Sequence, residues 1–236
     1  MERIDKLLSV SMNISRTDAG ALIKRGRVSV NGVSVKNQGF KVDSEKDIVE
    51  CDGKRVTYSK FVYIMMNKPK GVVSASEGEK AKTVVDILPD DMKRKNLFPA
   101  GRLDKDTTGF VLITDDGAFA HRILSPKNHI PKTYIATLDK PFDSQVVSAF
   151  EQGVKLMDHV CMPAKLSALD GDCTKAVVTI RQGMYHQIKR MFKKFGITVT
   201  ELERVKMGGL ELDKNLKLGQ CRYLTERELE LIENCK

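Results

Sequence analysis

The first forty residues of the chain change from a helical to a strand-like hydrophobic period. Apolar residues between positions 4 and 8 have the spacing of one helical face. A second helical face covers residues 16–25, behind Ser15, which stands where an N-cap is expected. Beyond Gly26 apolar residues alternate in two short runs separated by Asn-Gly at positions 31 and 32, a strong hairpin signal. The pattern predicts two helices followed by a β-hairpin.

From residue 61 onwards strand-like and helical patterns alternate over a longer region. The short polar stretch at 54–60 places the boundary near residue 60, with a small domain over residues 1–60 and a larger one over 61–236. In the helix at 118–124 we expect Ala118 and Leu124 to be buried with Phe119 and Ile123. Strands are expected at 61–66, 111–114, 131–138 and 176–180 and around 207–209 and 217–219; helices are expected at 83–88, 118–124, 144–152 and 226–232.

Composition and charge favour an intracellular protein that binds a polyanion. The chain of 236 residues has a formal net charge of +9, which favours binding to a polyanion. Its five cysteines form no Cys-x-x-Cys pair and its four histidines, His129 among them, have no metal spacing, so no structural metal site is expected. No run of about 18 apolar residues occurs and the N-terminus lacks a signal-peptide core. We therefore expect a protein of the reducing cytoplasm that does not enter a membrane.

The stretch 101–110, GRLDKDTTGF, carries the clearest candidate for chemistry. Asp104 lies between Arg102 and Lys105, in a loop bracketed by Gly101 and Gly109. Cations on both sides favour the ionised carboxylate, and an oriented carboxylate can act as nucleophile or general base. The other interpretation is an Asp that merely caps a turn.

The same stretch resembles the catalytic loop of the pseudouridine synthases, G-R-L-D-x-x-(T/S)-x-G-(L/F). The resemblance implies that Asp104 is the nucleophile and that Arg102 fills the gap left by the departing nucleotide. The string N-K-P-x-G at 67–71 resembles another motif of this family, which supports the catalytic loop there. We interpret it in this chain as a plain Pro-Gly turn.

Two further motifs of the family follow in order. A K-x-Y pair implies that Tyr134 stacks on the target base, although a tyrosine of a strand can also pack in a core. The string M-Y-H-Q-I-K-R-M-F at 184–192 implies that Lys189 pairs with Asp104; Lys is a point charge where relatives often have Arg, and Arg190 is the alternative partner. Apolar residues between these cations predict an amphipathic helix with one side docked.

Residues 1–60 resemble the small RNA-binding domain named after the fourth protein of the small ribosomal subunit. The resemblance rests on Ser15, Ala19, Gly26 and the Asn-Gly turn, among other positions. Solvated basic residues on a helix are the alternative interpretation. The residues expected to bind RNA are Arg3, Arg16, Lys24, Arg25 and Arg27 in this domain, with Arg102 and Arg190 in the larger one.

The resemblance implies an α+β fold in which the RNA-binding domain precedes a mixed, largely antiparallel sheet with flanking helices. It implies isomerisation of one uridine of 16S rRNA, of the 516 type, after the base is flipped out, by a monomer without cofactor or metal. Three alternatives stay open: a synthase acting on 23S rRNA, a non-catalytic rRNA-binding or assembly protein, and a magnesium-dependent phosphoryl-transfer enzyme that uses Asp104 and Asp106 as ligands.

Overall fold

The computed structural model describes residues 1–56, 58–78, 81–125, 128 and 130–235. Its contacts form two compact units, Met1–Val62 with Pro89–Asn96, and Tyr63–Leu88 with Leu97–Lys236. Segment Pro89–Asn96, which the sequence assigns to the larger domain, groups with the first unit, where Arg94 donates hydrogen bonds of 3.2 Å to the carbonyls of Ser59 and Lys60. The domain boundary near residue 60 stays a prediction.

The first unit has the two helices and the hairpin that the sequence predicts. Ser15 Oγ accepts a 3.0 Å hydrogen bond from the backbone N–H of Asp18, which confirms the N-cap. Asn31 and Gly32 both have positive φ, as the tight hairpin requires. Additional short strands extend the hairpin to a four-stranded sheet in the order β3-β2-β5-β6 and form a separate pair, β1 with β4. The elements are β1 Glu2–Arg3, α1 Ile4–Ser11, α2 Arg16–Lys24, β2 Val28–Val30, β3 Val33–Ser34, β4 Lys41–Val42, β5 Val49–Cys51 and β6 Lys54–Arg55.

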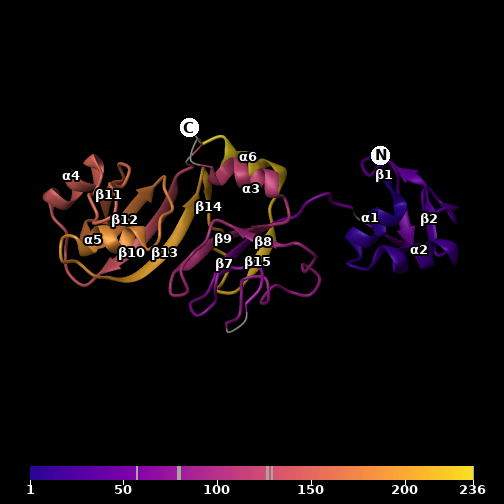
Figure 1. Ribbon diagram of the computed structural model, residues 1–236, viewed down its shortest axis with the longest axis horizontal. Coiled ribbons are helices and arrows are strands. Elements are labelled where there is room, and N and C mark those ends of the chain that lie inside the picture. The colour runs from indigo at the N-terminus through magenta and orange to yellow at the C-terminus, as the bar shows by residue number, and fades with distance from the viewer. Residues whose placement is uncertain (57, 79–80, 126–127, 129, 236) are drawn as a thin grey trace. The chain divides into compact units, whose positions relative to one another are not determined.

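The second unit is built on a nine-stranded sheet (Figure 1). The main path runs β11-β12-β10-β13-β9-β7-β15, with β14 paired to β13 and β8 to β9. Every one of these pairs is antiparallel except β9 with β13, so the expected α+β fold with a mixed, largely antiparallel sheet is confirmed. The strands are β7 Tyr63–Lys68, β8 Phe98–Ala100, β9 Thr108–Thr114, β10 Lys132–Leu138, β11 Lys165–Leu169, β12 Asp172–Ile180, β13 Val199–Met207, β14 Leu210–Glu211 and β15 Cys221–Tyr223.

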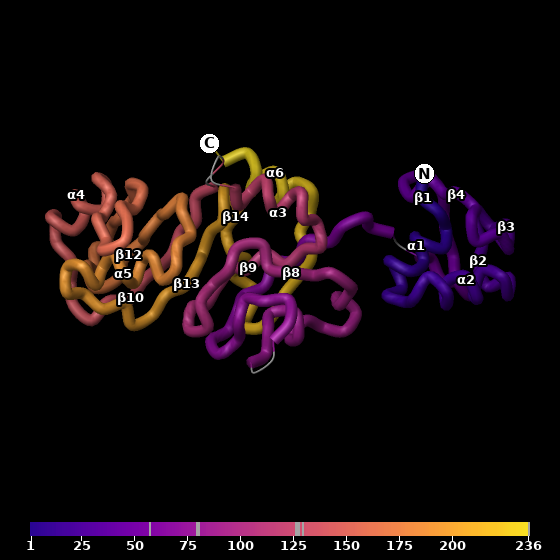
Figure 2. Tube along the Cα trace, viewed as in Figure 1, coloured from indigo at the N-terminus to yellow at the C-terminus, as the bar shows by residue number. Residues whose placement is uncertain are grey.

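In the described part of the second unit, four helices pack on this sheet. Helices α3 (Gly117–Leu124) and α6 (Glu226–Glu233) lie side by side and share a core with β7 and β9 (Figures 1 and 2). Helices α4 (Ser144–Gln152) and α5 (Gln187–Lys193) pack through Phe150 and Phe192, whose ring centroids are 4.9 Å apart. The docked side of α5 is therefore confirmed. No helix of the described ranges is both long and apolar enough to span a lipid bilayer.

Three local predictions are wrong. Residues 83–88 form turns rather than a helix, because Thr83 and Asp86 bond each other's backbone N–H through their side chains and Thr83 bridges to Val73. Residues 217–219 form a turn, and the strand begins two residues later, at Cys221. In α3 the buried residues are Phe119, Ala120 and Ile123, while Ala118 and Leu124 are exposed, because the face turned to the sheet is narrower than the apolar pattern.

Gly109 allows the one parallel contact of the sheet. It pairs with Arg204 of β13, and a Cβ atom at this position would lie 2.3 Å from the carbonyl oxygen of Arg204. Its φ of +97° also belongs to the region that favours glycine. The second glycine of the loop motif is thus needed to bring β9 against β13, and this contact places the loop that precedes β9.

Candidate active site

The loop that carries Asp104 connects β8 to β9. Hydrogen bonds to the N-K-P-x-G segment and to Ser74, which follows it, hold this loop in place. Gly71 N–H donates to the carbonyl of Lys105 at 2.8 Å, and Leu103 N–H donates to Ser74 Oγ at 3.1 Å. Thr107 N–H closes a turn on the carbonyl of Asp104 at 3.1 Å. These bonds fix the loop on both sides of Asp104.

Lys68 is the central support, and the interpretation of this segment as a plain turn missed it. Its side chain is fully buried at the end of β7. Its ammonium group donates to the carbonyls of Thr107 at 2.8 Å, Pro69 at 3.0 Å and Lys105 at 3.4 Å. Burial lowers the pKa of Lys68 to about 8, against the opposing effect of the nearby carboxylates of Asp106 and Asp104. The available sequence signal was a lysine in the N-K-P-x-G motif, two residues after an apolar run.

The lowered pKa of Lys68 predicts an alkaline stabilisation. From about pH 8 to the ordinary lysine value of 10.5, the unfolded chain keeps a proton at this site that the folded protein has lost. The free energy of unfolding should therefore rise with pH in this window, relative to Lys68→Met. Urea unfolding of both proteins from pH 7 to 10.5 measures the difference, with exposed Lys165→Met as control. A constant difference between wild type and Lys68→Met across that range would contradict the expected titration.

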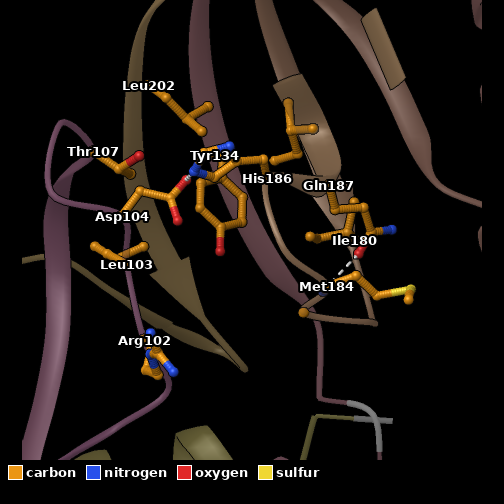
Figure 3. Close-up of a pocket in the computed structure, with 12 residues that line it drawn as sticks. Arg102, Leu103, Asp104, Thr107, Tyr134, Ile180, Met184, His186, Gln187 and Leu202 are labelled. Atoms are coloured by element: carbon orange, nitrogen blue, oxygen red, sulfur yellow. Dashed lines mark hydrogen bonds and ion pairs between the residues drawn. The ribbon is translucent and has the colours of Figure 1, made fainter. Parts of the chain in front are cut away.

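Asp104 lies beside two basic side chains from the α5 segment, His186 and Lys189, of which Figure 3 shows His186. Its Oδ2 is 3.6 Å from His186 Nε2 and 3.8 Å from Lys189 Nζ, and its side chain is 30% exposed. Sequence reasoning missed His186, although it belongs to the M-Y-H-Q string. His186 has a left-handed backbone (φ 49°) and its ring stacks on Tyr185 with centroids 3.8 Å apart. The carboxylate is thus accessible and flanked by cationic or hydrogen-bonding groups.

Lys189 has a closer partner than the one that the sequence implies. Its ammonium group is 2.7 Å from both carboxylate oxygens of Asp106, and this hydrogen bond is the main reason that the pKa of Asp106 is lowered. Arg190, the alternative partner of Asp104, instead pairs with Asp158. Lys189 therefore bridges two carboxylates of the loop, while Arg190 faces away from it.

The position of Lys189 bears on the alternative in which Asp104 and Asp106 bind a magnesium ion. A divalent ion between Asp104 and Asp106 would have to share that space with the Lys189 ammonium group, which already contacts both side chains. Among the described residues, no group of three or more His, Cys, Asp or Glu is arranged to hold a metal ion, and His129 lies outside those residues. The carboxylates are arranged as an ion-paired group.

Tyr134, on β10, lines the same pocket as Asp104 with its ring (Figure 3). The tyrosine is buried, and its hydroxyl lies 3.5 Å from Nη1 of Arg204, which donates to it. Arg204 is also buried and donates to the carbonyls of Phe110 at 2.7 Å and Gly101 at 3.0 Å. Arg204 therefore ties Tyr134 to both ends of the 101–110 stretch.

Arg102 is exposed and lines the pocket of Asp104 and Tyr134 as well as a wider cleft of about 590 Å³. The cleft also includes Asp104, Tyr185 and His186. Asp104 therefore lies where a small pocket opens into a larger cleft, and Arg102 borders both.

The basic residues of the first unit divide into two groups. Arg3 and Arg16 both bond the buried carboxylate of Asp5; burial raises the pKa of Asp5, but these bonds and that of Lys6 N–H lower it overall. Arg27 forms an ion pair with Asp52. Lys24 and Arg25, at the end of α2, are exposed and have no ion pair with a described carboxylate. These two are the cations most available to a ligand.

Two family matches account for most of the chain. The family of RNA pseudouridylate synthases matches residues 62–194, which include Asp104, Tyr134 and Lys189. The chain belongs to the RNA pseudouridine synthases. An S4 domain matches residues 2–49, so the first unit of this synthase is an RNA-binding domain of that type.

Relatives agree over nearly the full length. An RNA pseudouridine synthase of Bacillus subtilis, YtzG, is 44% identical over 98% of both chains. The ribosomal small subunit pseudouridine synthase A of Escherichia coli K12 is 40% identical over 96% of this chain and 98% of its own. A crystal structure of a pseudouridylate synthase superposes with a TM-score of 0.69 at 36% identity, covering 98% of this chain and 100% of the other. The synthase is an isomerase that acts on RNA.

Proposed function

We propose that the synthase converts one uridine of 16S rRNA, of the 516 type, to pseudouridine, with Asp104 as nucleophile. The observation that carries this proposal is the placement of the Asp104 carboxylate. It is partly exposed, lies beside His186 and Lys189, and shares its pocket with Tyr134. The reaction breaks the bond between N1 of uracil and C1′ of ribose and forms one from C5 to C1′. C5 loses a proton and N1 gains one, so no redox cofactor is needed.

The side chains around Asp104 take separate roles in this proposal. Lys189 stabilises the charge of the two loop carboxylates, since its ammonium contacts Asp106 directly and Asp104 at longer range. Tyr134 offers a ring face to the flipped base, an interaction worth about 1–3 kcal/mol. Arg102, at the border of pocket and cleft, occupies the gap that the base leaves in the RNA.

The choice of ribosomal RNA rests on the relatives and on the first unit. Several relatives near 40% identity carry the name ribosomal small subunit pseudouridine synthase A, and each aligns over nearly the whole of this chain. The S4 domain and the net charge of +9 support binding to a folded polyanion. We place the protein, as a monomer, in the cytoplasm, where ribosomal RNA is processed.

Mapping of pseudouridines tests the substrate. Ribosomal RNA from a strain that lacks this gene should lose one pseudouridine in 16S rRNA, detected by carbodiimide modification and primer extension. The wild-type gene should restore it and Asp104→Asn should not. A site that disappears from 23S rRNA instead would overturn the assignment to 16S rRNA, and no lost site in either RNA would overturn ribosomal RNA as substrate.

The exposed cations at the end of α2 predict where RNA affinity originates. We expect Lys24→Ala with Arg25→Ala to weaken rRNA binding about tenfold at moderate salt and to reduce the slope of log affinity against log salt by about 2. The rate of the bound complex should stay the same, because phosphate contacts position the RNA and do not react. Filter binding at several salt concentrations measures the affinity and its salt slope, with Lys165→Ala as the control. An unchanged salt slope would place the RNA contacts elsewhere.

A further inference from the structure

A further cavity, of about 670 Å³, shares Tyr134 and Arg102 with the pocket of Asp104, but neither Asp104 nor Asp106 lines it. Four cationic residues line it, and no carboxylate does among the described residues that form its wall. The cationic residues are Arg102, Lys132, Arg181 and Arg204. Two of the four, Lys132 and Arg204, are buried, and buried cations are normally paired with anions.

Lys132, the lysine of the K-x-Y motif, is 6% exposed. Its ammonium group donates to the carbonyls of Ile130 at 3.0 Å and Arg181 at 3.1 Å, and its third N–H has no hydrogen-bond partner among the residues that the structure describes. Burial, reinforced by the charge of Arg204, lowers the pKa of Lys132 to about 8. The group is thus still mainly cationic at neutral pH, and its hydrogen-bond partners among the described residues are neutral carbonyl oxygens.

Arg204 is 1% exposed and, like Lys132, is a buried cation whose hydrogen-bond partners among the described residues are neutral. Its three hydrogen bonds go to two carbonyl oxygens and, at 3.5 Å, to the hydroxyl of Tyr134. A guanidinium group has five N–H donors, so donors remain for a ligand. Two buried cations therefore line one cavity. Hydrogen bonds to neutral partners offset only part of the free-energy cost of removing these charges from water.

We propose that this cavity binds a phosphate group through Lys132, Arg181 and Arg204. A phosphate supplies the missing negative charge and accepts several charge-assisted hydrogen bonds at once. Arginine recognises such an oxyanion with a planar fork, and lysine with a point charge.

The carrier of the phosphate is the RNA backbone next to the flipped nucleotide. Tyr134 and Arg102 line both this cavity and the pocket of Asp104, so the two sites adjoin. A nucleotide whose base stacks on Tyr134 has a flanking phosphate within one backbone step of this cavity. This identification of the carrier rests on the proposed function, whereas the preference of the cavity for phosphate does not.

Titration with inorganic phosphate tests the site directly. Equilibrium dialysis at pH 7 and constant ionic strength compares the wild type with Lys132→Met and, as a matched control, Lys165→Met, which replaces an exposed lysine of β11. We expect saturable binding in wild type and control and about tenfold weaker binding in Lys132→Met. Equal affinity of Lys132→Met and wild type, or no saturable binding by the wild type, would overturn the proposal. Arg181→Met changes an exposed side chain and gives the same comparison should Lys132→Met fail to fold.

The dinucleotide UpU and its uncharged methylphosphonate analogue test the carrier. The wild type should prefer UpU about tenfold, and Lys132→Met should bind both equally. If the wild type binds inorganic phosphate but does not distinguish the two dinucleotides, the phosphate does not come from RNA. Both measurements concern binding alone, so they stand even if no uridine of 16S rRNA proves to be the substrate.

Discussion

Asp104→Asn is expected to lower the rate of isomerisation at least about 10⁴-fold, as loss of a nucleophile does. The amide has the same shape, but it cannot attack C1′ and carries no charge. The affinity for RNA should change by no more than about twofold, because phosphate contacts and stacking come from other residues. Folding should be preserved, since the loop is held by backbone bonds to Lys68, Gly71 and Ser74. This is the largest effect that we expect of a single substitution.

Release of tritium from rRNA labelled at C5 of uridine measures this rate, because C5 loses its hydrogen when it bonds to ribose. Asp91→Asn, an exposed carboxylate outside the pocket, is the matched control and should retain the full rate. A turnover of Asp104→Asn within tenfold of the wild type would remove Asp104 from the chemistry and leave it as a turn residue.

Lys189→Met should lower the single-turnover rate about 10²- to 10³-fold, the usual loss when one preorganised electrostatic contact is removed. The substitution leaves the carboxylates of Asp104 and Asp106 without the ammonium group that contacts both. Lys189→Arg should stay within about tenfold of wild type, because a guanidinium fork can reach both carboxylates. Rates at saturating RNA separate this effect from binding.

Asp106→Asn distinguishes two roles of Lys189. If Lys189 acts on Asp104, removing the competing charge of Asp106 leaves that contact in place, so Asp106→Asn should cost far less than Lys189→Met. If Lys189 only anchors the loop through its 2.7 Å contacts to Asp106, the two variants should lose the same rate and the double variant no more. Equal losses would therefore contradict a catalytic role of Lys189.

Local patterns in the sequence predicted the two helices and the hairpin of the first unit and marked the loop 101–110 as the candidate for chemistry. The N-cap at Ser15, the Asn-Gly turn and the spacing of apolar residues depend on neighbours within a few positions, which the sequence displays directly. The helix expected at 83–88 is the counterexample. There the side chains of Thr83 and Asp86 compete for the backbone, and apolar spacing does not reveal that competition.

Contacts between distant segments were decided by the tertiary structure alone. The sequence offered Lys189 or Arg190 as partner of Asp104, but only the fold brings Asp158 to Arg190 and Asp106 to Lys189. Likewise, the buried cations Lys68, Lys132 and Arg204 form hydrogen bonds to residues that lie 39 to 103 positions away in the sequence. Motifs identify which side chains are present, whereas the charge balance around each depends on strand order and register, because the desolvation and pairing of an ion are properties of its three-dimensional surroundings.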